Sequence, residues 1–166
     1  MKKINIGMIG LGTVGTGVYK ILTEQRHLLE ARLGLSLNLK RIVVRDPKKK
    51  REVSPPRELL SSNIKDILDD PEISLVIEVM GGADNDYPRQ ALEQGKHVVT
   101  ANKALLAERG GALFKLAAER GLFLSYEAAV AGGIPIIRAM EESFVGNNLQ
   151  QIHGIINGTA NYILSQ

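Results

Sequence analysis

The sequence predicts an α/β fold in which a doubly wound parallel sheet is flanked by helices. Short apolar runs alternate with stretches of helical period along most of the chain, and this alternation is typical of parallel strands joined by helices. The first apolar run, at residues 4–9, leads directly into the segment Gly10-Leu11-Gly12-Thr13-Val14-Gly15. This G-x-G-x-x-G pattern stands at a strand-to-helix turn, which is where a dinucleotide-binding fold requires it.

Each glycine of this loop has a separate physical role. Gly10 allows the tight turn, Gly12 leaves room for a pyrophosphate, and Gly15 lets the helix pack closely on the strand. The N-terminus of the following helix offers free N–H groups to phosphate oxygens. The residues predicted to bind the pyrophosphate are therefore Gly10, Gly12, Thr13, Val14 and Gly15. A glycine-rich turn without a ligand is the alternative.

The remaining elements follow from the same patterns. Strands are expected over residues 35–44, 73–80, 97–100 and 122–126, and helices over residues 14–33, 64–68, 88–94 and 105–120, with a polar connection over 53–70. From residue 134 the pattern changes to an amphipathic helix at 135–144, a strand at 149–156, a turn at 157–159 and a short helix at 160–166. We therefore expect a cofactor-binding domain over 1–133 and the incomplete beginning of a second, α+β domain over 134–166.

Composition restricts the class of protein. The 166 residues suffice for one ordinary domain with a core, and the absence of cysteine excludes disulfides, thiolate metal sites and a cysteine nucleophile. No apolar run approaches the roughly 18 residues that cross a bilayer, and the N-terminus lacks the layout of a signal peptide. A net charge of +3 suits an anionic small ligand without requiring nucleic acid. We expect a cytoplasmic protein with neither a membrane nor a nucleic acid as partner.

A basic segment follows the strand at 35–44. In a dinucleotide fold, an acidic residue at this place binds the ribose 2′-hydroxyl of NAD, whereas an arginine accommodates the 2′-phosphate of NADP. The chain places Arg45 and Asp46 side by side, with Lys49 and Arg51 close behind. A dianionic phosphate would be held well by Arg45, with Lys49 or Arg51 closing over it. This favours NADP over NAD, and a solvated basic loop is the alternative.

Two further segments end at the same edge of the predicted sheet. Glu78 lies inside an apolar run, where a carboxylate is costly unless it is paired or hydrogen-bonded. It either caps a neighbouring loop or orients a cation, and the sequence leaves both open. Gly81 and Gly82 follow and would let the nicotinamide approach closely. Thr100 ends the next strand, and Lys103 follows it. We include Gly81, Gly82 and Thr100 in the predicted cofactor site.

Five separated motifs together resemble homoserine dehydrogenase, and the resemblance spans essentially the whole chain. They are GLGTVGTGV at the N-terminus, VIEVMGG at 76–82, GKHVVTANKALLA at 95–107, YEAAVAGGIPII at 126–137 and GIINGTANYIL at 154–164. The last three are far more specific than the glycine loop. The resemblance implies a Rossmann-type cofactor domain followed by a substrate and dimerisation region, with a homodimer as the assembly of the longer protein.

The same resemblance implies the chemistry. The family interconverts aspartate 4-semialdehyde and L-homoserine with NAD(P)H, in the synthesis of threonine, methionine and isoleucine. Lys103, in the ANK motif, would lie by the nicotinamide ribose and the substrate and support catalysis. A sodium ion would be held, largely through backbone carbonyls, by Glu127, Val130, Gly132 and Ile134. A tight packing turn is the alternative for that loop.

One departure from the family pattern bears on activity. In the family, the NGTxNYIL helix is followed by a G-Y-A-E-x-D-P stretch and then by an acidic residue and the lysine taken as the proton donor. The sequence ends at Gln166 and contains none of these. Because a positioned acid is needed to deliver a proton to the developing alkoxide, we expect little turnover from this chain alone. A non-catalytic NAD(P)-binding regulatory module is the alternative.

Overall fold

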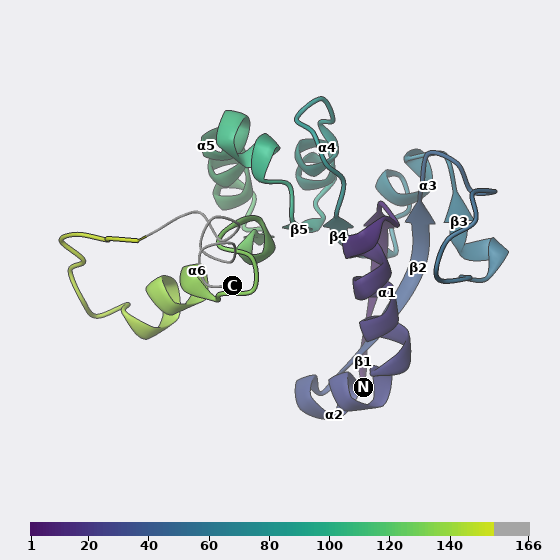
Figure 1. Ribbon diagram of the computed structural model, residues 1–166, viewed down its shortest axis with the longest axis horizontal. Helices are drawn as coiled ribbons and strands as arrows, with labels where there is room; N and C mark the ends of the chain where they lie inside the picture. Colours follow the sequence, from purple (N-terminus) through teal and green to yellow (C-terminus); the bar gives the residue numbers. More distant parts are fainter. Residues whose placement is uncertain (155–166) are drawn as a thin grey trace, which may run out of the picture.

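The computed structural model describes residues 1–154, and these form one six-stranded sheet with the order β3-β2-β1-β4-β5-β6. The strands are β1 (Lys2–Ile9), β2 (Leu35–Val43), β3 (Leu60–Ser61), β4 (Ile73–Glu78), β5 (His97–Thr100) and β6 (Leu124–Ser125). Every pairing between neighbouring strands is parallel. The predicted doubly wound parallel sheet is confirmed, because the chain leaves β1 in both directions, first toward β3 and then toward β6 (Figure 1).

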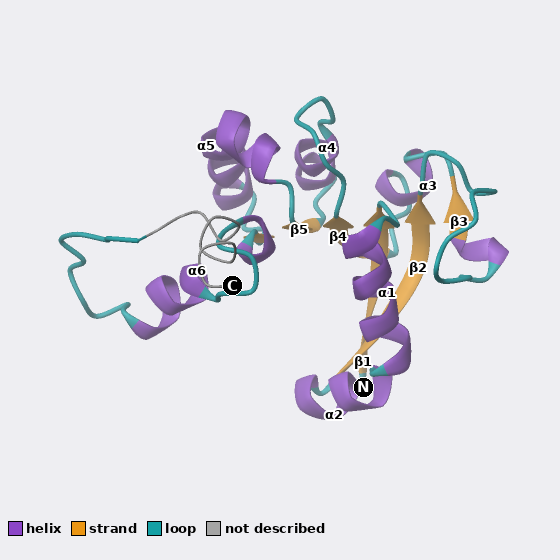
Figure 2. Ribbon diagram, in the orientation of Figure 1, coloured by secondary structure: helices purple, strands orange, loops and turns teal. Residues whose placement is uncertain are grey.

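Helices lie on both faces of the sheet (Figure 2). They are α1 (Thr13–Glu24), α2 (Arg26–Leu33), α3 (Lys65–Leu68), α4 (Tyr87–Glu93), α5 (Lys103–Glu119) and α6 (Ile136–Arg138), the last continued by a π-helical turn at Ala139–Ser143. The hydrophobic core accordingly has two parts, one on each face of the sheet. Ile9 of β1 packs into the cluster with α3, α4 and α5, whereas Met8 packs into the cluster under α1. Neighbouring strand residues thus serve opposite faces, as the pleat requires.

The structure corrects the predicted elements at several places. The predicted helix over 14–33 is two helices, because the backbone leaves helical geometry at Gln25 (φ −104°, ψ 18°). The predicted polar connection over 53–70 contains β3, which pairs with the end of β2 through Ile42 and Leu60. The last strand is shorter than predicted. No strand forms at residues 149–154, and the predicted turn and helix over 157–166 lie outside the described residues.

Within the described residues 1–154, none of the helices combines the length and the apolar character needed to cross a membrane. The division of the chain near residue 133 stays a prediction.

Candidate functional site

The glycine loop lies between the ends of β1, β2 and β4. The Gly10 amide donates to the carbonyl of Val43 at 2.9 Å, and its φ of +105° is a conformation that side chains rarely adopt. A Cβ atom at Gly15 would lie 2.5 Å from the carbonyl oxygen of Gly10, so the start of α1 can approach the turn this closely only without a side chain. The predicted reasons for glycine at these two positions are confirmed by the geometry.

Gly12 differs from both, because a Cβ atom built there would meet no atom within 4 Å. Packing therefore does not explain a glycine at this position. Gly12 is the N-cap of α1 and makes no side-chain cap, and Thr13 and Val14 of the first turn are exposed. The first N–H groups of a helix have no partner within the helix. The loop therefore presents open space in front of unpaired backbone donors, which suits the phosphates of a dinucleotide.

The basic loop after β2 is organised by its own side chains. Arg51 donates to the backbone carbonyls of Lys49 and Asp46, both at 2.7 Å, and the Asp46 carboxylate accepts from the amide of Lys48 at 2.8 Å. Arg51 thus holds the loop together rather than extending into solvent. Arg45 and Lys49 are exposed, which leaves their side chains accessible to an anion.

A pocket beside this loop contains residues that sequence reasoning missed. It lies at the carboxyl ends of β2 and β3 and is lined by Asp46, Pro47, Lys48, Pro55, Arg57, Leu60, Ser61 and Ser62. The additional cations are Lys48 and Arg57. Arg57 was missed because its segment had no strand pattern, so nothing in the sequence placed it beside the end of β2.

Glu78 caps the loops that follow β4 and β5. Its Oε2 accepts from the Thr100 hydroxyl at 2.6 Å, and its Oε1 accepts from the Met80 amide at 3.0 Å and from Asn102 Nδ2 at 3.5 Å. Of the two interpretations that the sequence left open, these contacts favour the loop cap. They also place Thr100 differently from the prediction, since its side chain is fully buried and its hydroxyl is directed to Glu78.

Burial raises the pKa of the Glu78 carboxyl above its ordinary value of 4.5, and the hydrogen bonds from Thr100, Met80 and Asn102 only partly oppose this. Because the folded pKa exceeds the unfolded one, the folded state keeps its proton where the unfolded chain has lost it. The contribution of this carboxyl to stability is therefore fully present below pH 4.5 and declines as the pH rises through the folded pKa.

We expect Glu78→Gln, which cannot ionise, to remove this decline. The free energy of unfolding of the variant minus that of the wild type should therefore increase as the pH rises from about 4 to about 7, so that the variant gains stability relative to the wild type. Urea unfolding at a series of pH values measures the difference. A difference that stays constant with pH would show that Glu78 titrates alike in both states.

The remaining predicted residues of the cofactor site lie near this cap. Gly81 and Gly82 are exposed, and Gly82 has a φ of +88°. Lys103 is the first residue of α5 and is exposed. A cation in the first turn of a helix is opposed by the helix dipole, so helix stability does not explain a lysine there. The carbonyl of Gly82 accepts from Asn102, the residue before Lys103, and this brings the two loops together.

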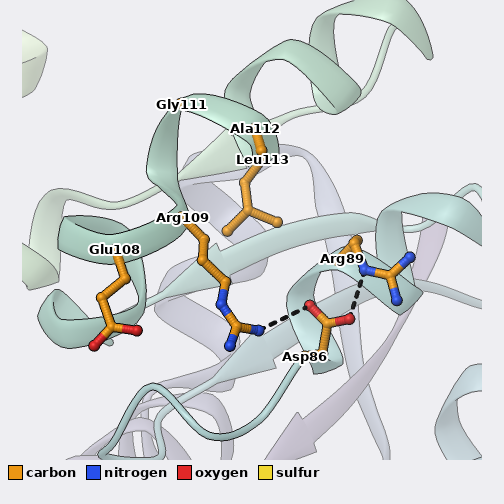
Figure 3. Close-up of a pocket in the computed structure, with 7 residues that line it drawn as sticks. All are labelled: Asp86, Arg89, Glu108, Arg109, Gly111, Ala112 and Leu113. Atoms are coloured by element: carbon orange, nitrogen blue, oxygen red, sulfur yellow. Dashed lines mark hydrogen bonds and ion pairs between the residues drawn. The ribbon is translucent and has the colours of Figure 1, made fainter.

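A charged cluster holds the far end of the β4–α4 loop. Figure 3 shows Arg89 and Arg109 pointing toward Asp86, which precedes α4. The Arg89 Nε–Asp86 Oδ2 distance is 2.5 Å and the Arg109 Nη1–Asp86 Oδ1 distance is 3.7 Å. Arg109 belongs to α5, so its ion pair with Asp86 connects this loop to α5. Exposed ion pairs contribute little to stability, and we assign this cluster no part in cofactor binding.

The loop predicted to bind sodium is occupied with its own hydrogen bonds. Both carboxylate oxygens of Glu127 accept backbone amides at the start of α6, from Ile137 at 3.0 Å and Arg138 at 2.9 Å. The carbonyls of Glu127 and Ile134 accept from Val130 and Ile136. Glu127 thus caps α6, and these contacts do not support the predicted sodium ion. Across the described residues 1–154, no group of three or more His, Cys, Asp and Glu side chains could hold a metal ion.

The chain is similar to proteins of one family. A family model described as "Homoserine dehydrogenase, NAD binding domain" matches residues 10–127, and one described as "Homoserine dehydrogenase" matches residues 135–166. The homoserine dehydrogenase of Bacillus subtilis (strain 168) is 45% identical over 100% of this chain and 39% of that protein. The homoserine dehydrogenase of Synechocystis sp. is 42% identical over 98% of this chain and 38% of that protein.

A solved structure agrees with this relationship. The homoserine dehydrogenase of Thiobacillus denitrificans superposes with a TM-score of 0.91 at 42% identity, covering 99% of this chain and 38% of that chain. The chain therefore spans about two-fifths of the length of these relatives. The parallel sheet, the glycine loop and the first family match, which alone covers more than half of the chain, lead to one conclusion: the chain belongs to the homoserine dehydrogenase family.

Proposed function

We propose that the chain is the NADP-binding part of a homoserine dehydrogenase. That enzyme would interconvert L-homoserine and L-aspartate 4-semialdehyde, in the synthesis of threonine, methionine and isoleucine. The observation that carries the proposal is the open space at Gly12, in front of the first turn of α1. The bound nicotinamide cofactor supplies or accepts the hydride. The residues of this chain bind and orient it.

In this proposal the carboxyl edge of the sheet has two halves. The pyrophosphate lies at the glycine loop and the 2′-phosphate at Arg45 and Lys49, with Lys48 and Arg57 contributing positive charge nearby. The nicotinamide lies toward Gly81 and Gly82. Lys103 would stabilise the negative charge that develops on the carbonyl oxygen of the substrate. Since the contacts of the predicted sodium loop do not support a bound cation, the proposed function includes no metal ion.

The same proposal covers the organisation of the chain. Residues 1–133 would form the cofactor domain, and residues 134–166 would begin the substrate and dimerisation region. The two family matches support this division, because one ends at residue 127 and the other begins at residue 135. The longer protein would act on its small-molecule substrate as a homodimer.

Calorimetric titration of the chain at fixed low salt, first with NADPH and then with NADH, tests the proposal. We expect NADPH to bind, and to bind more tightly than NADH. If neither ligand binds, the glycine loop is an element of the fold and not a cofactor site of this chain.

Arg45→Ala tests the preference between the two cofactors. We expect it to lower the affinity for NADPH about 30-fold, because charge-assisted hydrogen bonds to the 2′-phosphate are lost. The affinity for NADH should change less than about 3-fold. Lys50→Ala removes the same charge from the same loop at an exposed position and serves as the control. Equal losses of NADPH affinity in the two variants would mean that the affinity depends only on the net charge of the loop.

A further inference from the structure

The side chain of Asn102 joins two loops that border the proposed nicotinamide position. Its Nδ2 donates to the carbonyl of Gly82 at 2.7 Å, and its Oδ1 accepts from the amide of Leu105 at 3.2 Å. The first contact holds the loop after β4, and the second caps the N-terminus of α5. One buried side chain, 2% exposed, thus fixes the distance between Gly82 and Lys103.

Glu78 supports the same junction from below. It accepts from the amide of Met80, in the loop after β4, and from the hydroxyl of Thr100, at the end of β5. The Thr100 hydroxyl in turn accepts from the backbone amide of Asn102 at 3.0 Å. Two of these hydrogen bonds, from Thr100 to Glu78 and from Asn102 to Gly82, join the end of β4 to the end of β5, and the two strands lie side by side in Figure 1.

The position of Glu78 is costly for stability alone. Its side chain is fully buried in an otherwise apolar strand, and an ionised carboxylate in such a place loses hydration that hydrogen bonds only partly replace. A valine or isoleucine would satisfy the core of the sheet. An apolar residue could not accept hydrogen bonds from the loops after β4 and β5 at once. The buried carboxylate of Glu78 therefore stands where these two loops are joined.

We propose that Glu78 and Asn102 are positioning residues that set the nicotinamide half of the cofactor site, by fixing the Gly81–Gly82 loop against Lys103 at the start of α5. This inference rests on the proposed function. The adenosine half is proposed to lie at the ends of β1 and β2, and the side-chain hydrogen bonds of Glu78 and Asn102 go only to residues at the ends of β4 and β5 and the start of α5. The two residues should therefore affect one half of the cofactor and not the other.

The test compares two ligands in calorimetric titrations of the whole chain. NADPH contains both halves of the cofactor, whereas adenosine 2′,5′-bisphosphate contains only the adenosine half. Glu78→Gln keeps one acceptor oxygen and is expected to lower the affinity for NADPH about 5-fold. Asn102→Ser keeps a residue suited to the N-cap of α5, but the shorter serine side chain cannot reach the carbonyl of Gly82. This variant is expected to lower the affinity for NADPH about 10-fold.

Adenosine 2′,5′-bisphosphate should bind both variants within about 2-fold of the wild type. Glu72→Gln is the matched control, because Glu72 is exposed and pairs with Lys40 immediately before β4, at the opposite edge of the sheet. It should leave the affinity for both ligands unchanged. A thermal unfolding curve of each variant shows whether it is folded. If Glu78→Gln does not fold, Asn102→Ser alone carries the test.

Three results would overturn the inference. One is NADPH affinity that is unchanged in the variants, and another is an equal loss for both ligands, which would indicate a general loosening of the fold. The third is a wild-type chain that binds adenosine 2′,5′-bisphosphate as tightly as NADPH, because the nicotinamide half would then not be held at all. A wild-type chain that binds neither ligand would instead refute the proposed function, and the inference with it.

Discussion

Gly12→Val is expected to weaken NADPH binding about 100-fold, while the midpoint of thermal unfolding changes by less than about 2 °C. The structure separates these two effects. A Cβ atom at Gly12 would meet no protein atom within 4 Å, and a φ of −87° is accessible to valine. The added side chain would therefore displace no part of the fold. It would fill the space in front of α1 where the pyrophosphate is proposed to lie.

The measurement is a calorimetric titration with NADPH next to a thermal unfolding curve of the same sample. Gly17→Ala is the control, since Gly17 lies in the same helix and a Cβ atom there also meets nothing within 4 Å. Gly17→Ala should leave NADPH affinity unchanged. If Gly12→Val binds NADPH as the wild type does, the phosphates do not lie at this loop and the proposed orientation of the cofactor is wrong.

The fold was largely predictable because its longest elements have strong local signals. The apolar run of β1 and the glycine turn after it identify the first strand and helix without any knowledge of the rest. The errors occur where local signals are weak. Leu60 and Ser61 form a strand only because β2 offers them an edge, and the break at Gln25 has neither proline nor glycine to announce it. The pairing of β3 depends on a tertiary contact that a single sequence does not contain, and the break at Gln25 has no local signal in the sequence.

The candidate site was predictable in outline but not in its contacts. The patterns placed Glu78, Thr100 and Lys103 at one edge of the sheet, because parallel strands end together there. They could not show that the Thr100 hydroxyl is directed to Glu78, or that Arg51 binds the carbonyls of its own loop. Likewise Glu127 caps α6, which lies ten residues further along the chain. Which polar atom meets which is decided by packing.

Gly15→Ala is expected to destabilise the fold by about 3 kcal/mol and to lower the midpoint of thermal unfolding by about 9 °C. The added Cβ atom would lie 2.5 Å from the carbonyl oxygen of Gly10 and 3.2 Å from the Val79 side chain. The first contact is with backbone, so it cannot be relieved by rotating a side chain. The start of α1 would have to move away from the turn, which separates the helix N-terminus from the end of β1.

Gly17→Ala provides the opposite result in the same helix. It adds the same methyl group where nothing lies within 4 Å, and alanine in place of a helical glycine is expected to stabilise by up to about 1 kcal/mol. The two variants should therefore shift the unfolding midpoint in opposite directions. Urea unfolding would show the same order. If Gly15→Ala were as stable as the wild type, α1 would not need its close approach to Gly10, and the third glycine of the loop would have to be explained by ligand binding alone.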